Sequence, residues 1–179
     1  MVFFRITIME YFAVQVKTRG ESKYIKLFQS IYKIDTLRVH FPQRRLPIKS
    51  QGLSRSTLAP VFPGYIFIET EGKIDPDVYW ALRRTDGFYR FLQSNQNVQP
   101  LSGQDLEIVL HFIQVGPVAE TSKVYFNEED RIVVSEGPLK GLEGRIIKVD
   151  KRKGRAKIKL DFYDNSFAID LAFEIISRV

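Results

Sequence analysis

Residues 61–69 read Val-Phe-Pro-Gly-Tyr-Ile-Phe-Ile-Glu, an almost continuous apolar run. Such a run is typical of a central β-strand that is buried on both faces. Pro63 and Gly64 are unfavourable inside a strand, so we expect a bend there and a strand that starts near Tyr65. Side chains alternate along a strand, so Tyr65 and Phe67 are expected on one face of the sheet and the two isoleucines on the other.

Strand and helix patterns alternate on either side of this run. Apolar residues recur at every second position in the predicted strands and at every third or fourth position in the predicted helices. Ser102 and Asp105 form the S-x-x-D pattern that starts the last helix. The order β-α-β-β-α-β-α predicts a ferredoxin-like α/β sandwich. The predicted strands are 10–16, 37–41, 65–69 and 88–92, and the predicted helices are 21–31, 75–82 and 102–113.

The segment 43–57 interrupts this pattern with basic and turn-forming residues. It contains Arg44, Arg45, Lys49 and Arg55 but no acidic residue. Its Gly, Pro, Ser and Gln favour turns over a buried element. We expect a solvated, cationic loop or the tip of a hairpin.

A change of pattern near residue 117 predicts a domain boundary. Only short strands separated by polar turns follow it, which predicts a small β-barrel. We expect an N-terminal domain over 1–116, a flexible linker over 117–123 and a barrel over 124–179. Residues 1–8 are an extension if Met9 is the native start. The predicted strands are 130–135, 142–149, 156–162, 166–171 and 173–176.

The composition excludes several classes of site. The 179-residue chain has no Cys, which excludes disulfides, thiol nucleophiles and zinc–thiolate centres. The sequence contains only two His and has neither a Ser/His/Asp pattern nor a P-loop pattern, so it offers no catalytic constellation. We therefore expect no enzyme activity, no cofactor and no metal. No apolar stretch is long enough to span a membrane, and the lack of Cys suits the reducing cytoplasm. The net charge of +6 favours an anionic partner.

The positive charge is concentrated in residues 145–159, where eight Lys or Arg stand against one Asp. Such a hairpin creates a positive field in which phosphates can dock. Lys157 and Lys159 are two residues apart and therefore share one strand face, opposite Ile158 and Leu160. A charged face that serves only solubility is the alternative. The candidate phosphate ligands are Lys148, Lys151, Arg152, Lys153, Arg155, Lys157 and Lys159.

Several of these segments resemble the NusG family. Residues 11–15 are similar to the opening strand of its N-terminal (NGN) domain, and Phe62-Pro63-Gly64-Tyr65 to that domain's F-P-G-Y strand. Residues 130–146 resemble a KOW motif, and 162–171 the end of a KOW barrel. The resemblance implies an α+β protein with a ferredoxin-like NGN sandwich followed by a small KOW barrel.

The resemblance also implies partners. Family members bind the clamp helices of the β′ subunit of bacterial RNA polymerase through a hydrophobic depression, to which Phe62, Tyr65 and Phe67 correspond, with Gln15 at its edge. Spacing alone favours a core role for the three rings, whereas the resemblance implies that they form an exposed docking surface. The residues that correspond to positions facing upstream and non-template DNA are Lys17, Arg19, Arg83 and Arg84.

The basic hairpin is most similar to the LoaP-type branch of the family. That branch implies processive antitermination in long operons, with recognition of an RNA hairpin in the nascent leader. Residues 162–165 are Phe-Tyr-Asp-Asn and lack the Arg of housekeeping members, which weighs against binding of Rho or of ribosomal protein S10. The opening Trp of many members is Tyr11. We expect a cytoplasmic monomer; a general elongation factor and a KOW-containing ribosomal protein are the alternatives.

Overall fold

The computed structural model describes residues 8–33, 35–50 and 53–177. These residues form two compact units. Unit 1 contains the described residues of 1–41 and 62–106, and unit 2 those of 42–61 and 107–179. Nearly all of the possible extension at residues 1–8 lies outside the described residues.

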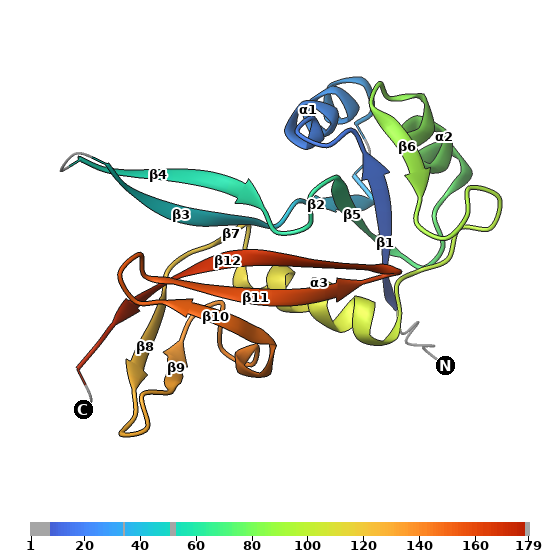
Figure 1. Ribbon diagram of the computed structural model, residues 1–179. Helices are drawn as coiled ribbons and strands as arrows, with labels where there is room; N and C mark the ends of the chain where they lie inside the picture. The colour runs from blue at the N-terminus through green and yellow to red at the C-terminus, as the bar shows by residue number, and fades with distance from the viewer. Residues whose placement is uncertain (1–7, 34, 51–52, 178–179) are drawn as a thin grey trace, which may run out of the picture. The chain divides into compact units, whose positions relative to one another are not determined.

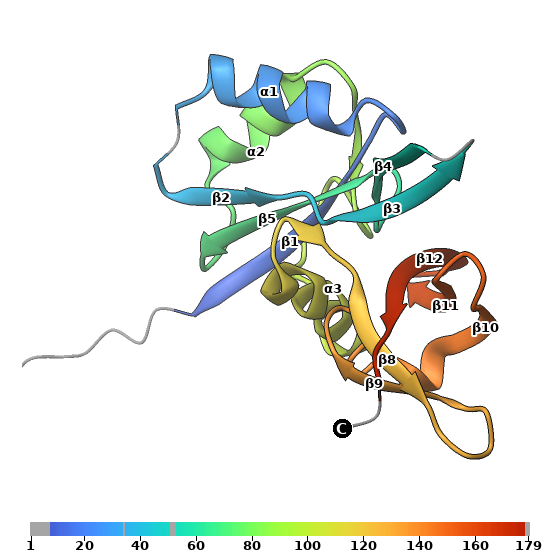
Figure 2. The same ribbon diagram turned by 90° about the vertical axis from the view of Figure 1, so that its left-hand side faces the viewer.

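Unit 1 is built on a four-stranded antiparallel sheet with the order β2-β5-β1-β6. Its strands are β1 (Met9–Val16), β2 (Leu37–His40), β5 (Tyr65–Glu71) and β6 (Phe88–Phe91). Helices α1 (Glu21–Ile31) and α2 (Pro76–Arg84) lie on the same side of this sheet (Figure 2). Counted without the inserted hairpin, the strand order is 2-3-1-4, which confirms the ferredoxin-like arrangement.

The core of unit 1 lies between this sheet and the two helices. Phe12, Val14 and Val16 of β1 pack there with Ile66 and Ile68 of β5 and with apolar residues of α1, α2 and β6. Tyr65 and Phe67 are absent from that cluster, so the predicted alternation along β5 is confirmed. The aromatic side chains occupy the sheet face opposite the helices.

A buried carboxylate fixes the turn before β5. Gly64 has a φ of +82°, which glycine adopts without the strain that a side chain would introduce. Its N–H donates to Glu21 Oε1 at 2.8 Å, at the first residue of α1. Glu21 is therefore a structural residue that joins the start of α1 to the Pro63-Gly64 bend. Its burial was not predicted, because an exposed acid at a helix start has the same sequence signature.

The segment between β2 and β5 is a long hairpin of β3 (Gln43–Ser50) and β4 (Leu53–Pro60) (Figure 1). The strands pair from Gln43 with Pro60 to Ser50 with Leu53. The loop alternative was therefore wrong, and the hairpin extends well beyond a tip. Its base is fixed in unit 2, because β3 pairs in parallel with β7 (Val118–Ala119).

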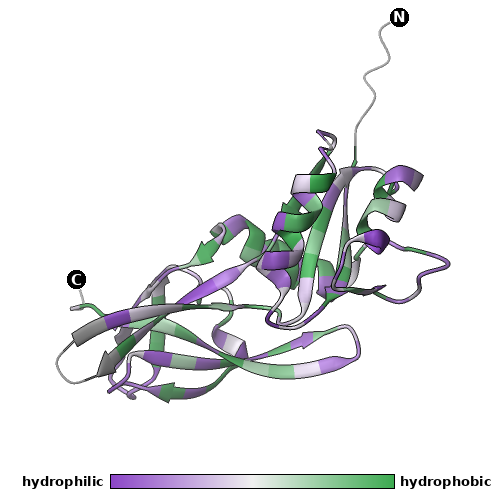
Figure 3. Ribbon diagram, turned by 90° about the horizontal axis from the view of Figure 1, so that it is seen from above, coloured by the Kyte–Doolittle hydropathy of each residue, from purple (hydrophilic) through white to green (hydrophobic). Residues whose placement is uncertain are grey.

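Helix α3 (Gly103–Val115) leads into the rest of unit 2, a strand-rich half-barrel with the order β10-β11-β12-β8-β9. Both hydrophilic and hydrophobic residues occur along its strands (Figure 3). Its elements are β8 (Ser122–Phe126), β9 (Ile132–Glu136), the 3₁₀ turn η1 (Glu143–Arg145), β10 (Ile146–Asp150), β11 (Arg155–Phe162) and β12 (Asn165–Ile175). This architecture confirms the α+β fold class.

Three expectations for this half of the chain need correction. The expected linker at 117–123 contains β7 and the start of β8, where the Oγ of the buried Ser122 accepts the Leu139 N–H at 3.0 Å. The two strands expected after residue 165 form the single strand β12, since Ala172 between them is paired with Arg155 of β11. The expected strand at 142–149 begins with η1. The domain bounds 1–116 and 124–179 stay a prediction. None of the described helices has the length and hydropathy that crossing a bilayer requires.

Candidate nucleic-acid interface

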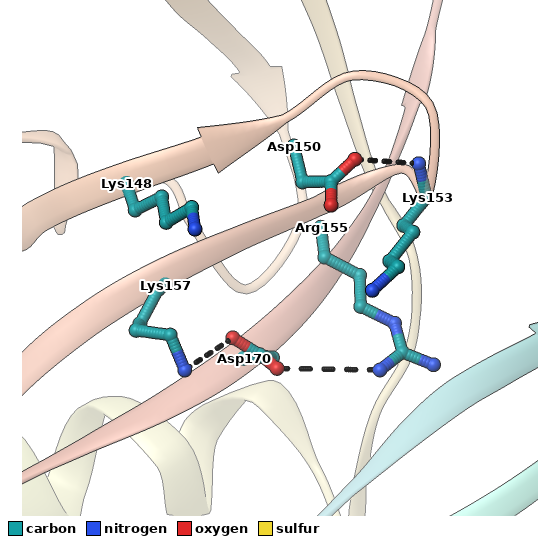
Figure 4. A pocket seen from close by; sticks show the side chains of 6 residues that line it. All are labelled: Lys148, Asp150, Lys153, Arg155, Lys157 and Asp170. Atoms are coloured by element: carbon teal, nitrogen blue, oxygen red, sulfur yellow. Dashed lines mark hydrogen bonds and ion pairs between the residues drawn. The ribbon is translucent and has the colours of Figure 1, made fainter.

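Strand β11 separates the charge of residues 155–161 cleanly from the core. Ala156, Ile158 and Leu160 are fully buried, whereas Lys157 and Lys159 lie on the opposite face. This confirms the predicted division of β11 into a basic face and an apolar face. In the register with β10, Lys148 stands opposite Lys157, so both strands contribute cations to the same face (Figure 4).

Asp170 on β12 partly neutralises this basic face. Its Oδ1 lies 3.1 Å from Lys157 Nζ, and its Oδ2 lies 4.0 Å from a terminal nitrogen of Arg155. The sequence did not indicate this contact, because Asp170 follows Lys157 by 13 residues and is aligned with it only by the β11–β12 register. Lys159 has a weaker partner in Asp161, at 3.8 Å between exposed side chains.

The β10–β11 turn carries three basic residues that differ in their contacts. Arg152 and Lys153 are exposed, and no described carboxylate forms an ion pair with either side chain. The Lys153 main-chain N–H donates to Asp150 Oδ1 at 2.9 Å, which shapes the turn. Lys151 differs from its neighbours because its ammonium pairs with Asp130 and lies 3.9 Å from the centre of the Phe126 ring.

Arg155 has a different role from the other predicted phosphate ligands. Its guanidinium donates to the Pro47 carbonyl of β3 at 2.6 Å, and its Nε is buried without a hydrogen-bond partner in the described residues. It therefore joins β11 to the β3–β4 hairpin. Arg44 of β3 donates to the Pro60 carbonyl at 2.9 Å in the same hairpin. Burial lowers the pKa of the Arg44 guanidinium; Asp170 opposes this shift and Arg155 adds to it.

The aromatic set predicted for polymerase binding is buried. The exposed fractions of Phe62, Tyr65 and Phe67 are 1%, 8% and 0%. The rings of Phe62 and Phe67 meet edge to face with centroids 5.2 Å apart. The expectation that these rings form an exposed surface is therefore wrong for this structure. The physical reason is that covering an apolar sheet face is favourable by roughly 25 cal/mol for each Å² removed from water. Their role as polymerase contacts remains untested.

Gln15 lies beside this aromatic set. It is paired with Tyr65 across the β1–β5 ladder, so their side chains share a face. Its Oε1 accepts a hydrogen bond from Arg90 Nε at 2.8 Å, which gives the edge of the aromatic set a polar border.

The four residues predicted to face DNA lie in the β1–α1 loop and at the end of helix α2 of unit 1. The Lys17 N–H donates to the Gly87 carbonyl at 2.8 Å, which holds the β1–α1 loop beside the α2–β6 loop. Arg19 lies in the first loop with a φ of 65°, and both of these cations are exposed. The structure thus brings Lys17 and Arg19 near the end of α2, which carries the other pair.

The other pair, Arg83 and Arg84, adjoins an exposed aromatic residue that was not predicted. The Arg83 guanidinium carbon lies 5.3 Å from the ring centres of Tyr79 and Trp80, and that of Arg84 lies 5.7 Å from the Trp80 ring. Trp80 is 49% exposed. The position of Trp80 on the helix did not indicate its exposure, because only the tertiary structure shows which helical positions are left uncovered.

The two histidines have ordinary polar partners. His40 Nε2 lies 2.5 Å from Glu69 Oε2, and His111 Nε2 lies 2.8 Å from the Pro138 carbonyl oxygen. Among the described residues, no group of three His, Cys, Asp or Glu side chains is arranged to hold a metal ion.

Comparison with known proteins identifies the family. The family model described as "Transcription termination factor nusG" matches residues 9–110. This chain belongs to the NusG family. The proteins called "Transcription termination/antitermination protein NusG" from Synechocystis sp. and Halalkalibacterium halodurans are 26% and 25% identical to it. The alignments cover 94% and 92% of this chain and 88% and 91% of those relatives.

A solved structure shares the fold. The chain titled "Domain interaction in Thermotoga maritima NusG" matches with a TM-score of 0.52 and 16% identity. The match covers 92% of this chain and 94% of that one. The family comparison favours a NusG-type protein over the alternative of a ribosomal protein.

Proposed function

We propose that this protein is a transcription termination/antitermination factor of the LoaP type, which binds RNA polymerase through unit 1 and an RNA hairpin of the nascent leader through unit 2. It makes and breaks no bond itself. It acts by binding the elongating complex more tightly than the paused one. The equilibrium between the two complexes then shifts toward the elongating one by the difference in binding free energy.

The observation that carries the RNA part is the set of unneutralised cations on the β10–β11 turn. The side chains of Arg152 and Lys153 form no ion pair with a described carboxylate, and Lys148 adds a third such cation on β10. A charged face that serves only solubility would gain nothing from concentrating one sign of charge at one turn. Phosphates, in contrast, bind best where several cations lie together and counterions are released on binding.

Transcription through a terminator tests this part. We expect the wild-type protein to increase read-through downstream of the native leader, and the variant Arg152→Ala/Lys153→Ala to lose that effect. The matched control is Lys123→Ala/Arg131→Ala, which removes two cations from the β8–β9 side of the same half-barrel. The two variants have the same net charge, so equal read-through by both would refute the assignment.

The polymerase part rests on the aromatic face of unit 1. Because Phe62, Tyr65 and Phe67 are buried, a partner can contact them only after this face has been uncovered. Such binding is weaker than binding to a preformed surface by the free energy of opening. Family membership and the position of Gln15 beside Tyr65 support this assignment.

Retention on RNA polymerase tests it with two matched substitutions. Phe67→Leu alters the aromatic face, whereas Phe12→Leu alters an equally buried ring on the helix side of the same sheet. The two changes cost similar stability. We expect Phe67→Leu to weaken binding to polymerase and Phe12→Leu to leave it unchanged. Equal binding by both variants would contradict the role of the aromatic face.

A general elongation role is the second candidate. It predicts the same polymerase retention but read-through that does not depend on the leader. Repeating the transcription assay with the leader deleted separates the two roles. The missing Arg in 162–165 disfavours binding of Rho or ribosomal protein S10 in either case. Non-template DNA is proposed to contact Lys17, Arg19, Arg83 and Arg84, all of which are exposed.

A further inference from the structure

Two hollows in unit 2 meet at the same two basic residues. The smaller, of about 230 Å³, lies on the basic face and is lined by Lys148, Asp150, Lys153, Arg155, Lys157 and Asp170 (Figure 4). The larger, of about 480 Å³, is lined by Pro47, Ile48, Arg152, Lys153 and Arg155. Because Lys153 and Arg155 line both, the hollows form one track from the basic face to the β3–β4 hairpin.

The two ends of this track differ in chemistry. The end on β10 and β11 is almost entirely charged. The end at the hairpin combines three cations with Ile48, an apolar side chain that is 41% exposed. Arg55 stands opposite Ile48 in the β3–β4 register, so it adds another exposed cation on the same face of the hairpin. An exposed β-branched residue among cations suits a ligand that has both apolar and anionic parts.

The hairpin is held in place for such a ligand. Arg155 donates to the Pro47 carbonyl at 2.6 Å and lies 4.0 Å from Asp170, so it connects β11, β12 and β3. Pairing of Gln43 and Arg44 with β7 fixes the other end of β3. The apolar end of the track is therefore positioned before any ligand arrives, which lowers the entropic cost of binding.

We propose that this track, here called the hairpin groove, binds a single-stranded nucleotide segment next to the RNA hairpin, with a base on Ile48 and its phosphates on Arg152 and Lys153. This inference rests on the RNA binding proposed above and extends it to the β3–β4 hairpin. Duplex RNA offers mainly phosphates and 2′-hydroxyls to a protein, whereas an unstacked base needs an apolar contact. Ile48 therefore indicates a single strand rather than more of the stem.

In this arrangement Arg155 is a positioning residue. It keeps the hairpin against the half-barrel, whereas Arg152 and Lys153 provide the phosphate contacts. The Asp150 and Asp170 carboxylates at the basic end repel phosphate but accept hydrogen bonds from 2′-hydroxyl groups, which favours RNA over DNA.

Binding of three RNA probes to the full-length protein tests the proposal. The probes are the leader hairpin alone, the hairpin with a single-stranded flank, and the flank alone. For the wild-type protein we expect the flank to tighten hairpin binding several-fold. Ile48→Ala should remove most of this advantage, about three- to tenfold, and leave binding of the bare hairpin unchanged. Ile48→Tyr should increase the advantage, because bases stack on aromatic rings.

Leu58→Ala is the matched control. Leu58 is 43% exposed on the same hairpin, but it is paired with Arg45 and therefore lies on the opposite face from Ile48. We expect it to bind all three probes like the wild type. A flank that adds no affinity to the wild-type protein, or an equal loss in Ile48→Ala and Leu58→Ala, would overturn the hairpin groove. Failure of the wild type to bind the bare hairpin would instead refute the proposed RNA function.

Discussion

The aromatic face of unit 1 and the basic face of unit 2 have the same alternation in sequence but differ in burial. In both, alternate residues of one strand share a face, as Tyr65 and Phe67 do on β5 and Lys157 and Lys159 do on β11. The rings are buried, whereas the lysines remain accessible. Periodicity thus determines which side chains share a face, and chemistry determines whether that face can be covered. Covering apolar rings is favourable, whereas removing the charged ammonium groups of lysines from water is costly.

The largest expected effect tests burial of the aromatic face. Phe67→Ala should lower the free energy of unfolding by about 3–5 kcal/mol, because it leaves a cavity at a fully buried ring. Lys157→Ala on the basic face should change it by about 0.5 kcal/mol or less. Chemical denaturation of both variants measures the difference. Similar values for the two would show that Phe67 is not buried in solution.

A second prediction concerns the buried charge of unit 1. Glu21→Ala should lower the free energy of unfolding by about 2 kcal/mol, because the Gly64 N–H loses a charged hydrogen-bond acceptor. Glu21→Gln should recover part of this loss, since its amide oxygen can still accept. Thermal unfolding distinguishes the two variants. Equal losses in both would mean that the contact depends on the charge and not on the hydrogen bond.

A third prediction sharpens the description of the basic face. Asp170→Asn removes the carboxylate next to Lys157 and Arg155, so RNA affinity should rise several-fold. The dependence on salt should become steeper, by about 0.7–0.9 for each further phosphate that the freed cations neutralise. Glu136→Gln, which frees Lys123 on the β8–β9 side, is the control and should have little effect. Weaker RNA binding by Asp170→Asn would show that Asp170 orients the cations for RNA.

The smallest effect concerns the exposed end of helix α2 in unit 1. Arg83→Ala should weaken binding of single-stranded DNA about two- to fivefold and leave stability nearly unchanged, since its contacts with Tyr79 and Trp80 are exposed. Arg83→Lys keeps the charge but loses the planar contact with the rings. Fluorescence anisotropy with labelled DNA compares the three proteins. Wild-type affinity in Arg83→Ala would remove this residue from the proposed DNA contacts.

Local patterns predicted most of the fold. The strands and helices of unit 1, their ferredoxin-like order and the inward and outward faces of β5 and β11 all follow from apolar periodicity. Features set by long-range pairing were missed. The expected linker contains strands because β7 pairs with β3, and Asp170 reaches Lys157 only through the β11–β12 register.

The salt dependence of RNA-hairpin binding tests the central claim most directly. It compares the wild-type protein with Arg152→Ala/Lys153→Ala and with the charge-matched control Lys123→Ala/Arg131→Ala. If the turn cations hold RNA phosphates, the first variant binds more weakly, and its plot of log affinity against log salt is shallower by about 1.4–1.8 because two phosphates are no longer neutralised, while the control matches the wild type. Identical slopes and affinities in all three proteins would contradict the claim.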